Sequence, residues 1–260
     1  MNPEEMNKIA DIVPEKSRNA LFEAPLRSIG YAINGYLNLK FGDLITIGAM
    51  TEGSLKSLAQ SVIEKSEQID SKNYDTTKLG IALKAIDEAK YSIEDENLRD
   101  MFASLITKAL DKTQNEYVSP LMVFILSNMS PKSAILFKNW YESLNGDKVS
   151  IVGQLVSKTS DENGNVQGTT MIERNIIVNG YGDILREEIT ADELITLGII
   201  EIPDEFLTSE LYTNQYEQLE KIITSWPISI TLTKNQKLSM DKRLIRLTPT
   251  GRTLANLLFN

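Results

Sequence analysis

The stretch Thr77–Trp140, TKLGIALKAIDEAKYSIEDENLRDMFASLITKALDKTQNEYVSPLMVFILSNMSPKSAILFKNW, decides the fold of the N-terminal part of the chain. Its apolar residues recur at the spacing of α-helices that bury one face. Serines suited to helix starts recur at Ser92, Ser119 and Ser130. The stretch therefore predicts a body of packed helices, and it contains no recognisable catalytic motif.

Helix boundaries follow from caps. Ser119-Pro120 and Ser130-Pro131 each place a serine N-cap before a proline at the first helical position, which predicts two consecutive helices with almost no loop between them. Upstream, apolar stripes predict helices over Ser54–Asp70 and Leu79–Ala89. We expect the apolar residues after Pro120 to belong to the core: Leu121, Val123, Phe124, Ile125 and Leu126.

A capping box at Ser92-x-x-Asp95 predicts the start of a third helix near Ser92. Glu94, Asp95, Glu96 and Asp100 lie around this start, and four such carboxylates raise the alternative of a metal site. A di-metal helical bundle uses Glu-x-x-His pairs, and the chain has no histidine. Capping and surface charge therefore explain these acids better, and we predict no metal and no cofactor.

After Asn145 the pattern changes from helical to β-rich. Val149–Ser157 and Thr169–Val178 are expected to be strands joined by a turn at Asp161-Glu162-Asn163-Gly164-Asn165. Further on, a helix ending in Leu197-Gly198-Ile199-Ile200 is followed by apparent strands at Ile228–Thr233 and Leu244–Thr248 with a basic turn between them. Together with the final LTPTGRTLANLL, this order is similar to a winged-helix domain.

The predicted fold class is thus mainly α. A helical body over residues 1–147 is followed by a smaller α+β module of winged-helix type over residues 148–260. Within the body, Met1–Glu23 is expected to be a helical arm and Ala24–Met50 short helices or a packed hairpin.

Composition limits the possible chemistry. The chain has 260 residues, of which 42% are hydrophobic, so it can bury a substantial core. It contains no cysteine and no histidine, which excludes disulfides, cysteine–zinc sites, Ser-His-Asp triads and histidine general bases. We therefore expect no enzymatic activity. An enzyme that uses carboxylates and Mg²⁺ ranks as the last alternative.

Charge is unevenly distributed around a formal net charge of −9. Asp183–Glu220 holds 11 acidic residues and one basic residue, whereas Lys234–Arg252 holds six basic residues and one acidic residue. A basic wing predicts phosphate contacts and DNA binding that weakens with salt, although the acidic segment would repel DNA. The candidate nucleic-acid-binding residues are Lys234, Lys237, Lys242, Arg243 and Arg246.

No secretory signal or membrane span is predicted. The apolar runs Ser28–Leu39 and Leu44–Thr51 are separated by Lys40 and Asp43, and each is shorter than the roughly 20 residues that cross a bilayer. A cytoplasmic location is the expectation.

The block AIDEAKYSIEDENLRDMFASLITKALD, followed by SPLMVFILSNMSPKSAIL, resembles the Abi-alpha family of bacterial proteins. The later ITLGII and LTPTGRTLANLL resemble the ending of the same family. This family is associated with abortive infection, a form of phage defence, and no settled catalytic residues come with it. The resemblance implies a role in phage defence. Our leading hypothesis is that the chain acts by binding a protein partner, with a phage component as one candidate. The alternative is a winged-helix DNA-binding regulator, and the sequence leaves the oligomeric state open.

Overall fold

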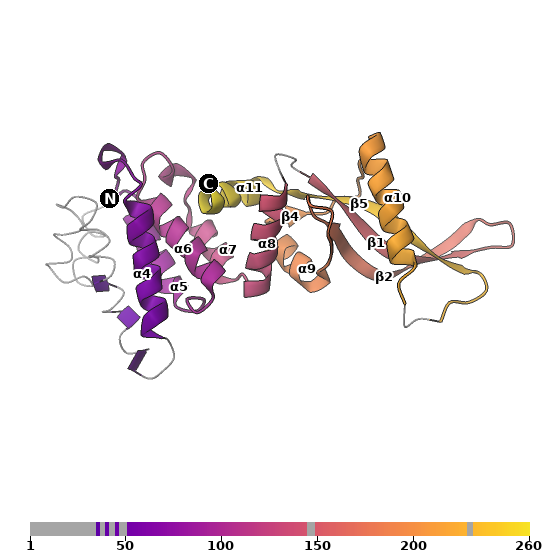
Figure 1. Cartoon of the computed structure of the whole chain (residues 1–260), viewed down its shortest axis with the longest axis horizontal. Coiled ribbons are helices and arrows are strands. Elements are labelled where there is room, and N and C mark those ends of the chain that lie inside the picture. The colour runs from indigo at the N-terminus through magenta and orange to yellow at the C-terminus, as the bar shows by residue number, and fades with distance from the viewer. Residues whose placement is uncertain (1–34, 37–39, 42–44, 47–50, 145–148, 228–230) are drawn as a thin grey trace. The chain divides into compact units, whose positions relative to one another are not determined.

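A computed structural model describes residues 35–36, 40–41, 45–46, 51–144, 149–227 and 231–260 (Figure 1). The predicted arm Met1–Glu23 and most of Ala24–Met50 lie outside the described residues. The contacts divide the chain into two compact units. Unit 1 consists of the described residues up to Ala134 together with Thr253–Asn260, and unit 2 consists of Ile135–Arg252. The predicted domain boundary at residues 147 and 148 stays a prediction.

Unit 1 is helical and is organised around one helix, α6 (Glu96–Ala109), which packs against three others. Its buried side chains come from nearly every face of the helix and include Phe102, Leu105 and Ile106. The surrounding helices are α4 (Glu52–Ser66), α5 (Leu79–Ala89) and α7 (Pro120–Ser127), with short 3-10 helices at Ser71–Asn73 and Asn115–Tyr117.

The serine–proline pairs start helices as the sequence predicts. Helix α7 begins at Pro120, and α8 (Pro131–Ser143) begins at Pro131. The Ser130 hydroxyl accepts a hydrogen bond from the Ser133 backbone N–H, whereas Ser119 makes no such bond through its side chain. The start near Ser92 is wrong by a few residues, because Asp95 is the N-cap of α6 and accepts from the Leu98 N–H at 2.9 Å.

Unit 2 contains a five-stranded antiparallel sheet in the order β3-β2-β1-β5-β4. The central strand β1 pairs along its length with β5, from Val149 opposite Arg246 to Thr159 opposite Gln236. It also pairs with β2, to which it is joined by the turn at Asp161. The bounds of the strands are β1 Val149–Ser160, β2 Val166–Val178, β3 Ile184–Arg186, β4 Ile200–Glu201 and β5 Gln236–Leu247.

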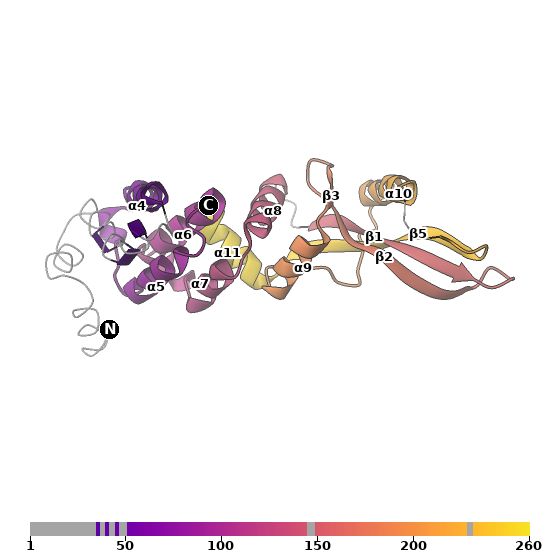
Figure 2. The same cartoon turned by 90° about the horizontal axis from the view of Figure 1, so that it is seen from below.

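Two helices pack on this sheet. Helix α9 (Glu188–Thr196) contacts β2 and β4, and α10 (Glu210–Thr224) crosses one face over β1 and β5 (Figures 1 and 2). Apolar residues of α10 and the strands form a buried cluster: Ile151, Leu155, Ile176, Tyr216, Leu219, Ile223 and Met240. The last helix, α11 (Pro249–Phe259), follows β5 directly.

The predicted fold class is therefore wrong. The described residues form eight α-helices and a five-stranded antiparallel sheet, an α+β fold in place of a mainly α chain with a small winged-helix module. Most of the segment predicted as a basic turn, from Gln236 onward, lies within β5, and Thr231–Thr233, the described end of the expected first wing strand, is not a strand. The run of charged residues Asp241, Lys242 and Arg243 is typical of a solvated turn. In the folded chain these residues lie within a strand, where contacts with other parts of the chain accommodate their charges.

A substitution at Gly251 tests the close approach between the start of α11 and Ile199. A Cβ atom at this position would collide with the backbone carbonyl oxygen of Ile199, whereas Gly53 in α4 has nothing within 4 Å of an added Cβ. We expect Gly251→Ala to lower the free energy of unfolding by about 1–3 kcal/mol, because the backbone of Ile199 has to shift. The control Gly53→Ala should leave it unchanged or raise it by up to about 1 kcal/mol. Urea unfolding followed by circular dichroism measures both, and equal effects would contradict this close approach.

Candidate functional site

The five basic residues predicted to contact nucleic acid lie on or just before strand β5. Lys237, Lys242, Arg243 and Arg246 are within the strand, and Lys234 lies in the turn before it. Neighbouring side chains on a strand point to opposite faces, so Lys242 and Arg243 cannot share one patch. The structure therefore distributes these residues over two faces of the sheet instead of collecting them on a wing.

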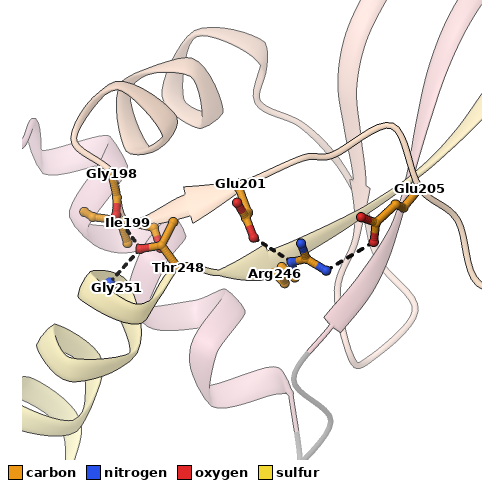
Figure 3. Close-up of polar contacts among 7 residues, drawn as sticks. All are labelled: Gly198, Ile199, Glu201, Glu205, Arg246, Thr248 and Gly251. Carbon is orange, nitrogen blue, oxygen red and sulfur yellow. Dashed lines mark hydrogen bonds and ion pairs between the residues drawn. The ribbon is translucent and has the colours of Figure 1, made fainter.

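Arg246 is bound by two acids of the segment that follows α9 (Figure 3). Its Nε donates to Glu201 Oε1 at 2.6 Å, and its Nη1 donates to Glu205 Oε2 at 3.2 Å. Strand pairing explains the first contact, because Glu201 on β4 lies directly opposite Arg246 on β5. The hydrogen bond to Glu201 raises the pKa of Arg246 above its ordinary value.

Arg243 is held in a similar way by Asp204, at 2.8 Å, and by Asp241, at 3.0 Å. Only 21% of its side chain is exposed. The acids Glu201, Asp204 and Glu205 thus place part of the acidic segment beside the basic strand, and both arginines are charge-compensated within unit 2. For a phosphate to bind either one, it would have to compete with carboxylates already in contact.

Helix α10 holds the same strand. The Tyr216 hydroxyl donates to the Arg243 carbonyl oxygen at 2.6 Å, and burial raises the pKa of Tyr216. The Lys242 ammonium lies 5.7 Å from the centre of the Tyr216 ring, within the range of a cation–π contact. Lys234 and Lys237 are exposed and are the two candidates whose position best suits a phosphate contact.

Two short motifs that are far apart in the sequence meet at Thr248 (Figure 3). Its hydroxyl donates to the Gly198 carbonyl oxygen and accepts from the Gly251 N–H at 2.9 Å. Its own N–H donates to the Ile199 carbonyl oxygen at 3.0 Å. Gly198 has a φ of 69°, which a residue with a Cβ rarely adopts. Hydrogen bonds at Thr248 therefore join the motifs LGII and LTPTG at the start of α11.

The acids considered as metal ligands have structural roles. Glu94 accepts from the Thr51 N–H at 2.9 Å and from the Ser54 hydroxyl at 2.7 Å, and the Thr51 bond is the main reason that its pKa is lowered. Asp100 contacts Lys65 at 3.2 Å. Over the described ranges of the chain, no group of three or more acidic residues is arranged to hold a metal ion.

The sequence analysis missed an exposed apolar surface on α7. Leu121 and Phe124, assigned above to the core, are 49% and 55% exposed, and Tyr117 just before the helix is 52% exposed. Val123, Ile125 and Leu126 are buried as predicted. This helix is apolar on all sides, and a short helix that packs on one side leaves its opposite side in solvent. The all-apolar pattern is therefore the signal that could have predicted an exposed apolar face. We call Tyr117, Leu121 and Phe124 the α7 surface.

The comparison with protein families identifies the chain. A model of the family described as abortive infection alpha matches residues 50–258. The chain belongs to this family. The family name refers to abortive infection, and the match confirms the resemblance found in the sequence. No curated protein and no solved structure shows significant similarity to the chain.

The family match leaves several predictions untested. DNA contact by the five basic residues and the absence of catalysis both stay predictions. As to membranes, no single helix in the described part of the chain is long and apolar enough to cross a bilayer; the bent pair α7 and α8 meets the length and composition criteria only when the two helices are taken together.

A substitution of Tyr216 tests whether the hydrogen bond from α10 to β5 stabilises the fold. In Tyr216→Phe the Arg243 carbonyl loses a buried donor, so we expect the free energy of unfolding to fall by about 1–2 kcal/mol. The control Tyr181→Phe removes a hydroxyl from a ring that is 66% exposed and should change it by less than about 0.5 kcal/mol. Chemical denaturation of the three proteins measures the difference. A loss in Tyr216→Phe no larger than in the control would contradict this role.

Proposed function

We propose that the chain is a phage-defence protein that acts by binding a protein partner rather than by catalysis. Membership of the abortive infection alpha family supports the biological role. The observation that carries the molecular role is the α7 surface, where Leu121, Phe124 and Tyr117 are each about half exposed. The lack of histidine and cysteine in the sequence removes the commonest general base and the thiolate nucleophile, which favours binding over catalysis.

The α7 surface has the chemistry of a protein-binding site. Leu121 and Phe124 are three residues apart on one helix, so their side chains lie on the same face. Contiguous exposed apolar side chains mark protein interaction sites, and Tyr is among the residue types that contribute most to the energy of protein interfaces. A protein partner with a complementary apolar pocket would remove these side chains from water.

The α7 surface is also held in a fixed orientation. On the opposite face of the helix Val123 and Leu126 are fully buried, which anchors α7 in unit 1. The helix ends where the Asn128 side chain donates to the Phe124 carbonyl oxygen at 2.8 Å. A rigid surface loses little conformational entropy when a partner binds, which favours affinity. A phage-encoded protein is the first candidate partner, because the defence role requires that infection be detected.

A plaque assay tests the proposal. We expect expression of the wild-type chain to reduce plating by at least one phage of a broad panel, and the double variant Leu121→Ser with Phe124→Ser to lose this protection. Both side chains are about half exposed, so the double variant should still fold, which thermal unfolding checks. The matched control is Ile189→Ser on α9, which removes an apolar side chain that is 84% exposed in unit 2.

Affinity purification from infected cells gives the molecular readout. The wild-type chain and the Ile189→Ser control should retain a protein that the double variant does not, as identified by mass spectrometry. Full protection by a folded double variant would contradict binding through the α7 surface. Unchanged plating with the wild-type chain across the panel would contradict the defence role itself.

A further inference from the structure

Strand β2 has a long open edge. Its inner end, Ile176–Val178, pairs with β3, but from Val166 to Arg174 its outer edge pairs with no other strand among the described residues. The side chains from Val166 to Met171 are all exposed. An open edge of this kind presents a row of unpaired N–H and C=O groups, which another extended chain can pair with.

Strand β5, on the other side of β1, is protected against pairing with another chain. On β5, the Arg243 carbonyl is bonded to Tyr216 of α10, and the Met240 N–H donates to Glu220 Oε1 of the same helix at 3.2 Å. Lys237 and Lys242 also lie on this strand. Covering helices and lysines are the devices by which proteins prevent strands from pairing at sheet edges.

Strand β2 has neither device. From Asn163 to Ile172 it contains no charged residue and no proline. Helix α9 lies beside its inner end only, where Arg174 and Asn175 bind Asp192. At that point Asn175 has a φ of 54° and the register with β1 shifts, which forms a bulge. The open edge is therefore a defined segment, Val166–Glu173, which we call the β2 edge.

We propose that the β2 edge pairs antiparallel with the β2 edge of a second copy of this chain. Strand β5 is protected and the β2 edge is not, which indicates that the β2 edge is available for pairing. Its sequence is compatible with pairing to an identical strand. Two identical antiparallel strands are related by a two-fold axis, so each residue lies opposite the residue at the mirrored position. The pair would join two five-stranded sheets into one continuous sheet.

The sequence of the β2 edge suits this symmetry. With either Thr169 or Thr170 on the two-fold axis, that threonine faces its own copy, and cross-strand threonine pairs are favourable. The charged residues nearest the axis, Glu162 and Glu173, then fall opposite uncharged residues of the other copy in both registers. No like charges oppose each other in either register, and both threonines lie in Gly168–Met171, the stretch between the register shifts near Gln167 and Ile172. This inference does not depend on the proposed function, because it concerns a different unit and a different surface.

Analytical ultracentrifugation tests the proposal. The wild-type chain should sediment as a dimer in equilibrium with monomer between micromolar and submillimolar concentrations. Thr169→Lys should sediment as a monomer, because the variant places two lysines near the two-fold axis. The control Thr159→Lys adds the same charge to the central strand β1, about one strand spacing further from the second copy, and should still dimerise at physiological salt. A monomeric wild type, or a dimer that persists in folded Thr169→Lys, would overturn the proposal.

Cysteine cross-linking provides a second readout that tolerates little disturbance of the fold. The chain has no cysteine of its own, so each single variant carries one thiol. Opposed residues on antiparallel strands have Cα atoms about 4.5–5.5 Å apart, within the range of a disulfide. We expect Thr169→Cys or Thr170→Cys to form a disulfide-linked dimer under mild oxidation and Thr159→Cys to stay monomeric. If neither threonine variant cross-links above the Thr159→Cys control, the β2 edge is not the interface between copies.

Discussion

The pairing of β1 with β5 is the constraint on which unit 2 depends. These strands are far apart in the sequence, yet they are in register from Val149–Arg246 to Thr159–Gln236. In this register β1 is the central strand, and α10 packs on β1 and β5. It also places Arg246 opposite Glu201 and brings Thr248 to Gly198, which fixes the start of α11.

Charge compensation makes this pairing possible. An interior strand position is costly for a charged side chain unless an opposite charge or a polar group lies beside it. Arg243 and Arg246 meet Asp204, Glu201 and Glu205, and Lys242 lies over the Tyr216 ring. Acidic and basic residues that are separated in the sequence are therefore paired in the folded chain. The segments Asp183–Glu220 and Lys234–Arg252 together carry a net charge of −5, and the rest of the chain carries the other −4 of the total of −9.

Local signals in the sequence predicted most of unit 1 and misjudged much of unit 2. Ser119-Pro120 and Ser130-Pro131 start helices because capping needs only neighbouring residues, and the turn at Asp161 is equally local. The end of β5 was predicted as a strand, but its first part was missed, because Asp241-Lys242-Arg243 is typical of a turn until its distant partners are known. Leu121 and Phe124 were misassigned for a related reason: which face of an all-apolar helix is buried depends on tertiary packing. The candidate binding surfaces, α7 and the β2 edge, are thus features that only the fold reveals.

Amide hydrogen exchange across residues 234–247 tests most directly whether the basic segment is a strand. If β5 pairs with β1 as described, its amides bonded to β1 should exchange as slowly as those of β1 itself, because they open only when the sheet unfolds. An exposed basic wing turn would instead exchange as fast as the turn at Asp161. Slow exchange from Lys237 to Leu247 is the predicted result, and uniformly fast exchange over those residues would contradict the sheet on which this account of unit 2 depends.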